Sequence, residues 1–163
     1  FYAVPVSTYA LSGKQVAIVG YGHLGRPVAL NLRDSGVTVL VGTRGEDSRE
    51  QAQTDGFNAT SIEDAVKSAQ IIFMLLPDEV MPPFYLEQVS PHLKRGDMLV
   101  FGSAYNVAFG FIEAPAFVDV ALIAPRLLGA AVRQALGSKP HLLDLNVEAL
   151  ARGRRAAETV AAP

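Results

Sequence analysis

Short apolar runs, rich in Val, Ile and Leu, recur along the chain without the strict polar alternation of a half-exposed strand. Continuous runs of this kind are typical of strands that are buried on both faces, as in a parallel sheet. The pattern therefore predicts strands at residues 16–19, 37–41, 71–76, 98–101, 120–123 and 142–145.

Stretches with helical character lie between these runs and predict helices at residues 24–34, 47–54, 62–68, 80–93 and 147–161. Gly36 follows the first of them as a C-terminal stop, and Ser61 with Asp64 forms a capping pair at the start of the third. Pro82 and Pro83 fall in an opening helical turn, where proline is tolerated. Strand and helix in alternation indicate parallel strands joined by right-handed crossovers, and hence an α/β fold with a doubly wound, mostly parallel sheet.

The length bounds the number of domains. The chain has 163 residues, half of them apolar, which is enough for one hydrophobic core and too few for two ordinary domains. It contains no fixed-period repeat, low-complexity segment or long linker. We therefore expect a single domain over residues 1–163.

Charge and cysteine content exclude several classes of function. A net charge of −2 offers no basic patch for nucleic acid or an anionic membrane, so neither is an expected partner. The absence of cysteine excludes disulfides, a thiolate nucleophile and a Cys-based zinc site. The chain shows no leader-like start, and no apolar run approaches the roughly 18 to 20 residues that span a bilayer. We expect a soluble protein of the cytoplasm.

The strongest chemical signal is the glycine-rich turn Gly20-Tyr21-Gly22-His23-Leu24-Gly25, which follows an apolar run and opens a helix. In this setting the first glycine permits a tight turn, the second lets a pyrophosphate approach the backbone, and the third lets the helix pack on the strand. Helix-terminal amides then face the phosphates. The turn predicts a Rossmann-type dinucleotide-binding domain; the alternative is a glycine-rich turn that binds nothing.

The tip of the second predicted strand indicates which dinucleotide is bound. NAD-type sites carry Asp or Glu there, whereas this chain has Thr43-Arg44, followed by Ser48. Guanidinium and hydroxyl groups donate to phosphate oxygens, which favours the 2′-phosphate of NADP. Glu46 and Asp47 lie in the same loop and would repel that phosphate if they faced it. We expect NADP, with NAD as the alternative.

Several blocks of the sequence resemble the N-terminal, NADP-binding domain of the ketol-acid reductoisomerase (acetohydroxy-acid isomeroreductase) family. They are Phe1-Tyr2, residues 11–14, 16–22, 29–36 and 75–80, Asn106, Phe109-Gly110 and Ala124-Pro125. The resemblance implies an oxidoreductase of branched-chain amino-acid biosynthesis that uses NADPH and Mg²⁺. That family also has a helical domain whose carboxylates hold two magnesium ions, and we expect that domain to be absent from this chain.

The chain departs from the family pattern at the rim of the site. Ser103-Ala104-Tyr105-Asn106 stands where the family has His-Gly-Phe-Asn, and Arg126 stands where it has lysine. Similarly, His23-Leu24 replaces Ser-Gln, and Arg26-Pro27 replaces His-Ala. A scaffold retained with its site altered indicates chemistry that has been changed or lost.

The remaining site candidates each follow a predicted strand. By resemblance, Leu75, Leu76 and Pro77 line the path of the adenosine and its ribose, with Leu75 as a core residue the alternative. Asp78, which follows them, is a further candidate for cofactor binding. Gly102 and Ser103 follow the fourth predicted strand, and Ser103 is a weak catalytic candidate that also fits a simple turn serine.

Arg126 is a second weak catalytic candidate, able to hold a carboxylate but permanently charged and so not a general acid. We expect no metal site in this chain, because its histidines are isolated and its paired acids suit solvated helix starts.

Two functions remain open at this point. The first is the cofactor-binding half of an NADP-dependent, ketol-acid reductoisomerase-like oxidoreductase, inactive alone and dependent on a second domain or subunit. The second is a non-catalytic dinucleotide-binding module for regulation or assembly. For either function we expect a homo-oligomer.

Overall fold

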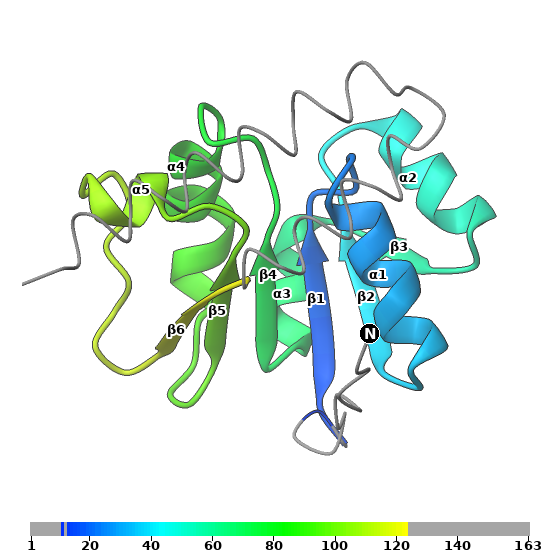
Figure 1. Ribbon diagram of the computed structural model, residues 1–163, viewed down its shortest axis with the longest axis horizontal. Helices are drawn as coiled ribbons and strands as arrows, with labels where there is room; N and C mark the ends of the chain where they lie inside the picture. Colours follow the sequence, from blue (N-terminus) through cyan, green and yellow to red (C-terminus); the bar gives the residue numbers. More distant parts are fainter. Residues whose placement is uncertain (1–10, 12, 124–163) are drawn as a thin grey trace, which may run out of the picture.

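The computed structural model describes residue 11 and residues 13–123, and its strands pair into one parallel sheet with helices on both faces (Figure 1). In chain order the elements are β1 (Gln15–Val19), α1 (Gly25–Asp34), β2 (Thr38–Gly42), α2 (Glu46–Thr54), β3 (Asn58–Thr60), α3 (Ile62–Ser68), β4 (Ile71–Met74), α4 (Met81–Phe84), a π-helical turn (Tyr85–Val89), a 3-10 turn (Ser90–His92), β5 (Met98–Phe101), α5 (Tyr105–Ala108) and β6 (Asp119–Leu122). The strand and helix predicted at 142–145 and 147–161, and Arg126, lie outside the described residues.

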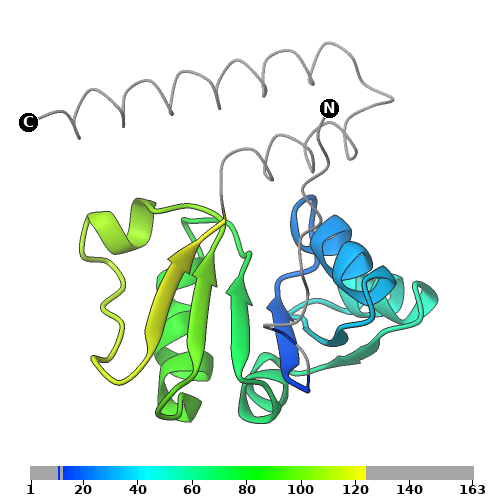
Figure 2. The same cartoon turned by 60° about the horizontal axis from the view of Figure 1, so that its bottom comes forward.

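The strand order is β3-β2-β1-β4-β5-β6, and every neighbouring pair is parallel. From β1 the chain winds outward to β3, crosses back to β4 beside β1, and winds outward again to β6. This is the doubly wound order of a Rossmann-type fold, as the sequence predicted. Because the strands are parallel, their carboxyl ends all meet at one edge of the sheet, where the arrowheads point in Figure 2.

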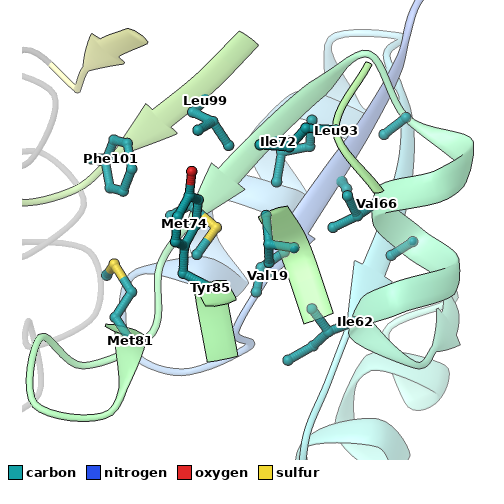
Figure 3. Close-up of a cluster of buried hydrophobic side chains, with 14 of the residues drawn as sticks. Val19, Ile62, Val66, Ile72, Met74, Met81, Tyr85, Leu93, Leu99 and Phe101 are labelled. Atoms are coloured by element: carbon teal, nitrogen blue, oxygen red, sulfur yellow. The ribbon is translucent and has the colours of Figure 1, made fainter. Parts of the chain in front are cut away.

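The sheet divides the core into two layers, because successive side chains of each strand point to opposite faces. In β1, Val16 and Ile18 pack with Ala29 of α1 on one face. Val19 packs on the other face with Ile62 of α3, in the cluster that Figure 3 shows. All four residues of β1 from Val16 to Val19 are fully buried, which explains why the sequence shows an unbroken apolar run there.

Local signals at the helix ends behave as predicted. Gly36, after α1, has a φ of +80°, and its amide donates to the carbonyl oxygen of Arg33. The hydroxyl oxygen of Ser61 accepts a hydrogen bond from the amide of Asp64 at 3.1 Å. None of the described helices has the length and apolar character needed to cross a membrane.

The predicted helix 80–93 is wrong as a single element. It is divided into α4, the π-helical turn and the 3-10 turn. Pro91 has no N–H to donate, and its ring would clash with the carbonyl group of Glu87, so a regular α-helix cannot pass through it. Widening to a π turn accommodates this and keeps Tyr85 and Val89 buried.

Two short elements were not predicted. β3 has only three residues, Asn-Ala-Thr, and carries no apolar run. α5 has four residues and follows the end of β5. In addition, β4 ends at Met74 rather than at residue 76, so Leu75 and Leu76 belong to the loop at the sheet edge.

Candidate functional site

A pocket of about 520 Å³ lies at the carboxyl edge of the sheet, beside β1 and β4. The chain leaves these two neighbouring strands toward opposite halves of the sheet. Its walls come from the loops that follow β1, β2, β4 and β5. The lining residues are Gly20, Tyr21, Gly22, His23, Leu24, Thr43, Arg44, Gly45, Ser48, Met74, Leu75, Leu76, Pro77, Asp78, Met81, Gly102 and Ser103. In open α/β sheets this crevice is where ligands bind.

The predicted residues of the site therefore come together, with two exceptions. Gly25 does not line the pocket; it lies behind the turn, packed against Gly20 and Ile18. Arg126 lies outside the described residues. Thr43, Gly45, Met74 and Met81 line the pocket without having been predicted.

The glycine turn is shaped by three different constraints. Gly20 has a φ of +98°, and a Cβ there would lie 2.8 Å from the carbonyl oxygen of Leu75. A Cβ at Gly25 would overlap the carbonyl oxygen of Gly20. Around Gly22, in contrast, no atom of the described chain lies within 4 Å of an added Cβ. Gly22 is exposed and lines the pocket, so a Cβ there would meet no described residue.

The turn leads directly into the N-terminus of α1. Leu24 is the N-cap, and no side chain of the described residues caps the helix there. The first turn of α1 also contains no acidic residue. The positive end of the helix dipole is thus available at the pocket, which is favourable for a bound anion.

The loop after β2 provides hydrogen-bond donors at one end of the pocket. Arg44 is exposed, and its guanidinium carbon lies 5.2 Å from the centre of the Phe84 ring. Thr43 is only 5% exposed, and its hydroxyl has no hydrogen-bond partner within the described residues. Glu46 and Asp47 are exposed at the start of α2 and do not line the pocket. Arg44 and Ser48 can therefore donate to a phosphate or a sugar hydroxyl there.

The loops after β4 and β5 form the other end of the pocket. A Cβ at Gly102 would lie 2.9 Å from a methyl carbon of Leu24 and 3.1 Å from one of Leu75. The hydroxyl oxygen of Ser103 accepts a hydrogen bond from the amide of Tyr105 at 3.2 Å. Ser103 is thus a turn serine as well as a lining residue, and its O–H remains able to donate.

Asn106 fixes the position of the loop after β4. It is only 2% exposed, and its side-chain amide donates to the main-chain oxygen of Asp78 at 3.0 Å and to the carboxylate at 3.2 Å. These contacts tie the β4 loop to α5, which begins just after Ser103. This pairing was not predicted, because the two residues are 28 positions apart and no local pattern links them.

Tyr21 connects the turn to the end of α2. Its hydroxyl donates to Oδ2 of Asp55 at 2.8 Å. Burial, and then this hydrogen bond, raise the pKa of Tyr21 well above its ordinary value, so the phenol stays protonated.

Metal ligands do not gather around the pocket. Among residue 11 and residues 13–123, no group of three histidine or carboxylate side chains is placed to hold a metal ion. His23 is exposed on the glycine turn, and Asp78 is engaged by Asn106. The described site offers donors for an anion rather than ligands for a cation.

Comparison with known proteins agrees with this geometry. Residues 10–162 match the family model described as "Acetohydroxy acid isomeroreductase, NADPH-binding domain". An NADH-preferring ketol-acid reductoisomerase from an uncultured archaeon is 37% identical, with a TM-score of 0.71 over 74% of this chain and 38% of its own. The chain thus spans well under half the length of that reductoisomerase.

More distant structures share the fold alone. A semialdehyde dehydrogenase NAD-binding protein from Cupriavidus necator is 21% identical, with a TM-score of 0.59 over 66% of this chain and 39% of its own. The 3-hydroxyisobutyrate dehydrogenase of Mycobacterium tuberculosis is 18% identical, with a TM-score of 0.57 over 80% of this chain and 50% of its own.

Proposed function

The chain belongs to the family of the acetohydroxy acid isomeroreductase (ketol-acid reductoisomerase) NADPH-binding domain, and we propose that it binds NADPH in the pocket at the carboxyl edge of its sheet. The observation that carries the proposal is the contrast within the glycine turn. Gly20 and Gly25 are required by their protein neighbours, whereas Gly22 faces open space in the pocket. A bare backbone beside an uncapped helix N-terminus suits the approach of a pyrophosphate.

The loop after β2 supports NADP rather than NAD. In this proposal, Arg44 and Ser48 hold the 2′-phosphate. The acids that would have opposed this assignment, Glu46 and Asp47, lie outside the pocket lining. The related reductoisomerase that prefers NADH keeps NAD as the alternative.

The other lining residues are assigned along the length of the cofactor. Leu75, Leu76, Pro77 and Asp78 hold the adenosine and its ribose, and Gly102 and Ser103 border the nicotinamide end. When bound, the cofactor supplies a hydride. The Ser103 hydroxyl orients the nicotinamide ribose or a substrate oxygen through its free O–H, while its oxygen stays bonded to the amide of Tyr105.

We propose that the chain is the cofactor half of an oxidoreductase and does not complete the reaction alone. The alkyl migration that precedes the reduction needs metal ions, and the described residues contain no cluster suited to hold them. A second domain or subunit would supply that cluster, and a homo-oligomer remains a prediction. A module that binds the dinucleotide without catalysis is the alternative.

The proposal is tested by titrating the chain with NADPH and following nicotinamide fluorescence, with Gly22→Ala and Gly22→Val compared to wild type. Both variants should fold with an unchanged Tm, because a Cβ at Gly22 has open space. Gly22→Ala should bind more weakly, and Gly22→Val should not bind measurably. Wild-type affinity in a folded Gly22→Val variant would refute the assignment of the turn.

A further inference from the structure

Arg26, a departure from the family pattern, has a specific partner in this chain. Its Nε donates to Oδ2 of Asp55 at 2.7 Å and its Nη2 donates to Oδ1 at 2.9 Å. Arg26 does not line the pocket, although it lies in the first turn of α1, directly after Gly25. Arg26 therefore forms an ion pair outside the pocket lining.

The geometry of this pair sets it apart from an ordinary surface salt bridge. Exposed pairs contribute little unless their geometry is close to ideal. Here both oxygens of the carboxylate engage the guanidinium fork, and the Asp55 side chain is only 11% exposed. The Arg26 hydrogen bond, followed by that from Tyr21, holds the pKa of Asp55 well below its usual range. The carboxylate is therefore ionised at neutral pH.

The Arg26–Asp55 ion pair lies at the C-terminal end of α2. Asp55 is the C-cap of α2, where the negative end of the helix dipole disfavours an acid. Four hydrogen bonds offset this cost: two from Arg26, one from Tyr21 and a longer one from Gln51 at 3.3 Å. Asp55 thus joins a residue of the glycine turn, the first turn of α1 and the end of α2.

A second set of contacts holds the same corner. The rings of Tyr21 and Phe57 meet edge to face with their centres 5.8 Å apart. The guanidinium carbon of Arg33 lies over the Phe57 ring, 5.1 Å from its centre, and Arg33 also donates to the main-chain oxygen of Asp55 at 2.6 Å. The turn after α2 is therefore fixed against α1 and the glycine turn.

α2 packs against β3 but buries little of its own surface, so the corner at Asp55 is a further anchor for it. Ala52 is its only buried residue. The opposite end of the same helix carries Ser48, and Gly45 precedes it, both in the pocket lining. A shift at Asp55 would therefore be transmitted along a short helix to the residues that face the candidate 2′-phosphate position.

We propose that Tyr21, Arg26 and Asp55 form a clamp that positions the glycine turn and α2 relative to each other, and so sets the affinity of the chain for its dinucleotide. The inference rests on the proposed function. The three residues act as positioning residues: Arg26 and Asp55 lie outside the pocket, and the Tyr21 hydroxyl is bonded to Asp55.

The test uses Asp55→Asn, Arg26→Ala and Arg26→Lys in the full chain. The matched control is Lys67→Ala, which breaks the Glu63–Lys67 ion pair on α3. NADPH affinity should fall about tenfold in Asp55→Asn and Arg26→Ala, within the usual range of coupling between contacting residues. The double variant Arg26→Ala/Asp55→Asn should lose no more NADPH affinity than either of these single variants. Arg26→Lys should recover part of the affinity, and the control should bind like wild type.

Amide hydrogen exchange without any ligand provides a readout that does not depend on the cofactor. In Asp55→Asn and Arg26→Ala, residues 20–25 and 46–55 should exchange faster, while β5 stays as protected as in wild type. Unchanged exchange in both segments would overturn the clamp. So would equal affinities for NADPH in folded variants and wild type. If the wild-type chain does not bind NADPH, the proposed function is refuted. Amide hydrogen exchange would then still decide whether the clamp positions the turn.

Discussion

The replacement Arg44→Ala tests most directly which dinucleotide the pocket accepts. Arg44 lines the pocket and stacks on Phe84 from α4, with 5.2 Å between the guanidinium carbon and the ring centre. NADPH carries a 2′-phosphate that NADH lacks, so removal of the guanidinium should weaken NADPH and leave NADH almost unchanged. Arg95→Ala is the matched control, because it removes an exposed positive charge from the turn that precedes β5. That turn lies at the amino ends of the strands, opposite the pocket.

The size of the effect follows from the exposure of the group. A hydrogen bond to a charged group contributes about 1.5 to 3 kcal/mol, and solvent screening at an exposed arginine favours the lower part of this range. Since about 1.4 kcal/mol corresponds to tenfold in affinity, the ratio of NADPH to NADH affinity should fall roughly tenfold or more. Phe84→Leu keeps the Arg44 guanidinium and removes the aromatic ring beneath it. A cation–π contact of about 0.5 to 1 kcal/mol predicts a smaller loss of NADPH affinity, roughly twofold to fivefold.

Both cofactors should be titrated by nicotinamide fluorescence at fixed ionic strength, and the NADPH series repeated at higher salt. Salt should weaken NADPH binding by wild type more than by Arg44→Ala, because the screened charge pair is already absent from the variant. An equal loss of NADPH and NADH in Arg44→Ala would refute the assignment of Arg44 to the 2′-phosphate.

Two further predictions concern acid stability and turnover. The folded-state pKa of Asp55 lies below its unfolded value of about 3.9, so its stabilisation is present above that pH and is lost as the pH falls toward the folded-state value. The Tm difference between wild type and Asp55→Asn should stay constant from about pH 7 to 5 and narrow below about pH 4; a difference that does not narrow there would contradict the ionised clamp. Secondly, the purified chain should not consume NADPH when supplied with 2-acetolactate and Mg²⁺, as followed by absorbance, because the described residues hold no metal-binding cluster. NADPH consumption that persists after further purification of the chain would show that the chain completes the reaction unaided.

Much of the fold was predictable because its signals are local. The buried strands gave continuous apolar runs, and the alternation of strand and helix led to a parallel sheet. β3 was not predicted because it has only three residues, none of them with a large apolar side chain, and it lies at the end of the strand order. The division of helix 80–93 was visible in principle, since Pro91 stands inside the predicted span.

The glycine turn was predictable for the same reason, because its spacing lies within six consecutive residues. Contacts between distant residues were not. Tyr21 and Asp55 are 34 positions apart, and Asn106 and Asp78 are 28 apart. Arg26 in particular was interpreted as an alteration of the site rim, whereas the structure pairs it with Asp55 behind the turn. A residue that differs from a family pattern can therefore reinforce the scaffold.

The unequal surroundings of the three turn glycines separate two kinds of evolutionary selection. Any lineage that keeps this fold must keep Gly20 and Gly25, because a side chain at either position collides with the backbone. The described residues place no such demand on Gly22, because none of their atoms lies within 4 Å of a Cβ added there. In the proposed function, only the bound dinucleotide restrains that position. In descendants that abandon the dinucleotide, substitutions should therefore accumulate at Gly22 first, while its two neighbouring glycines persist as a record of the ancestral turn.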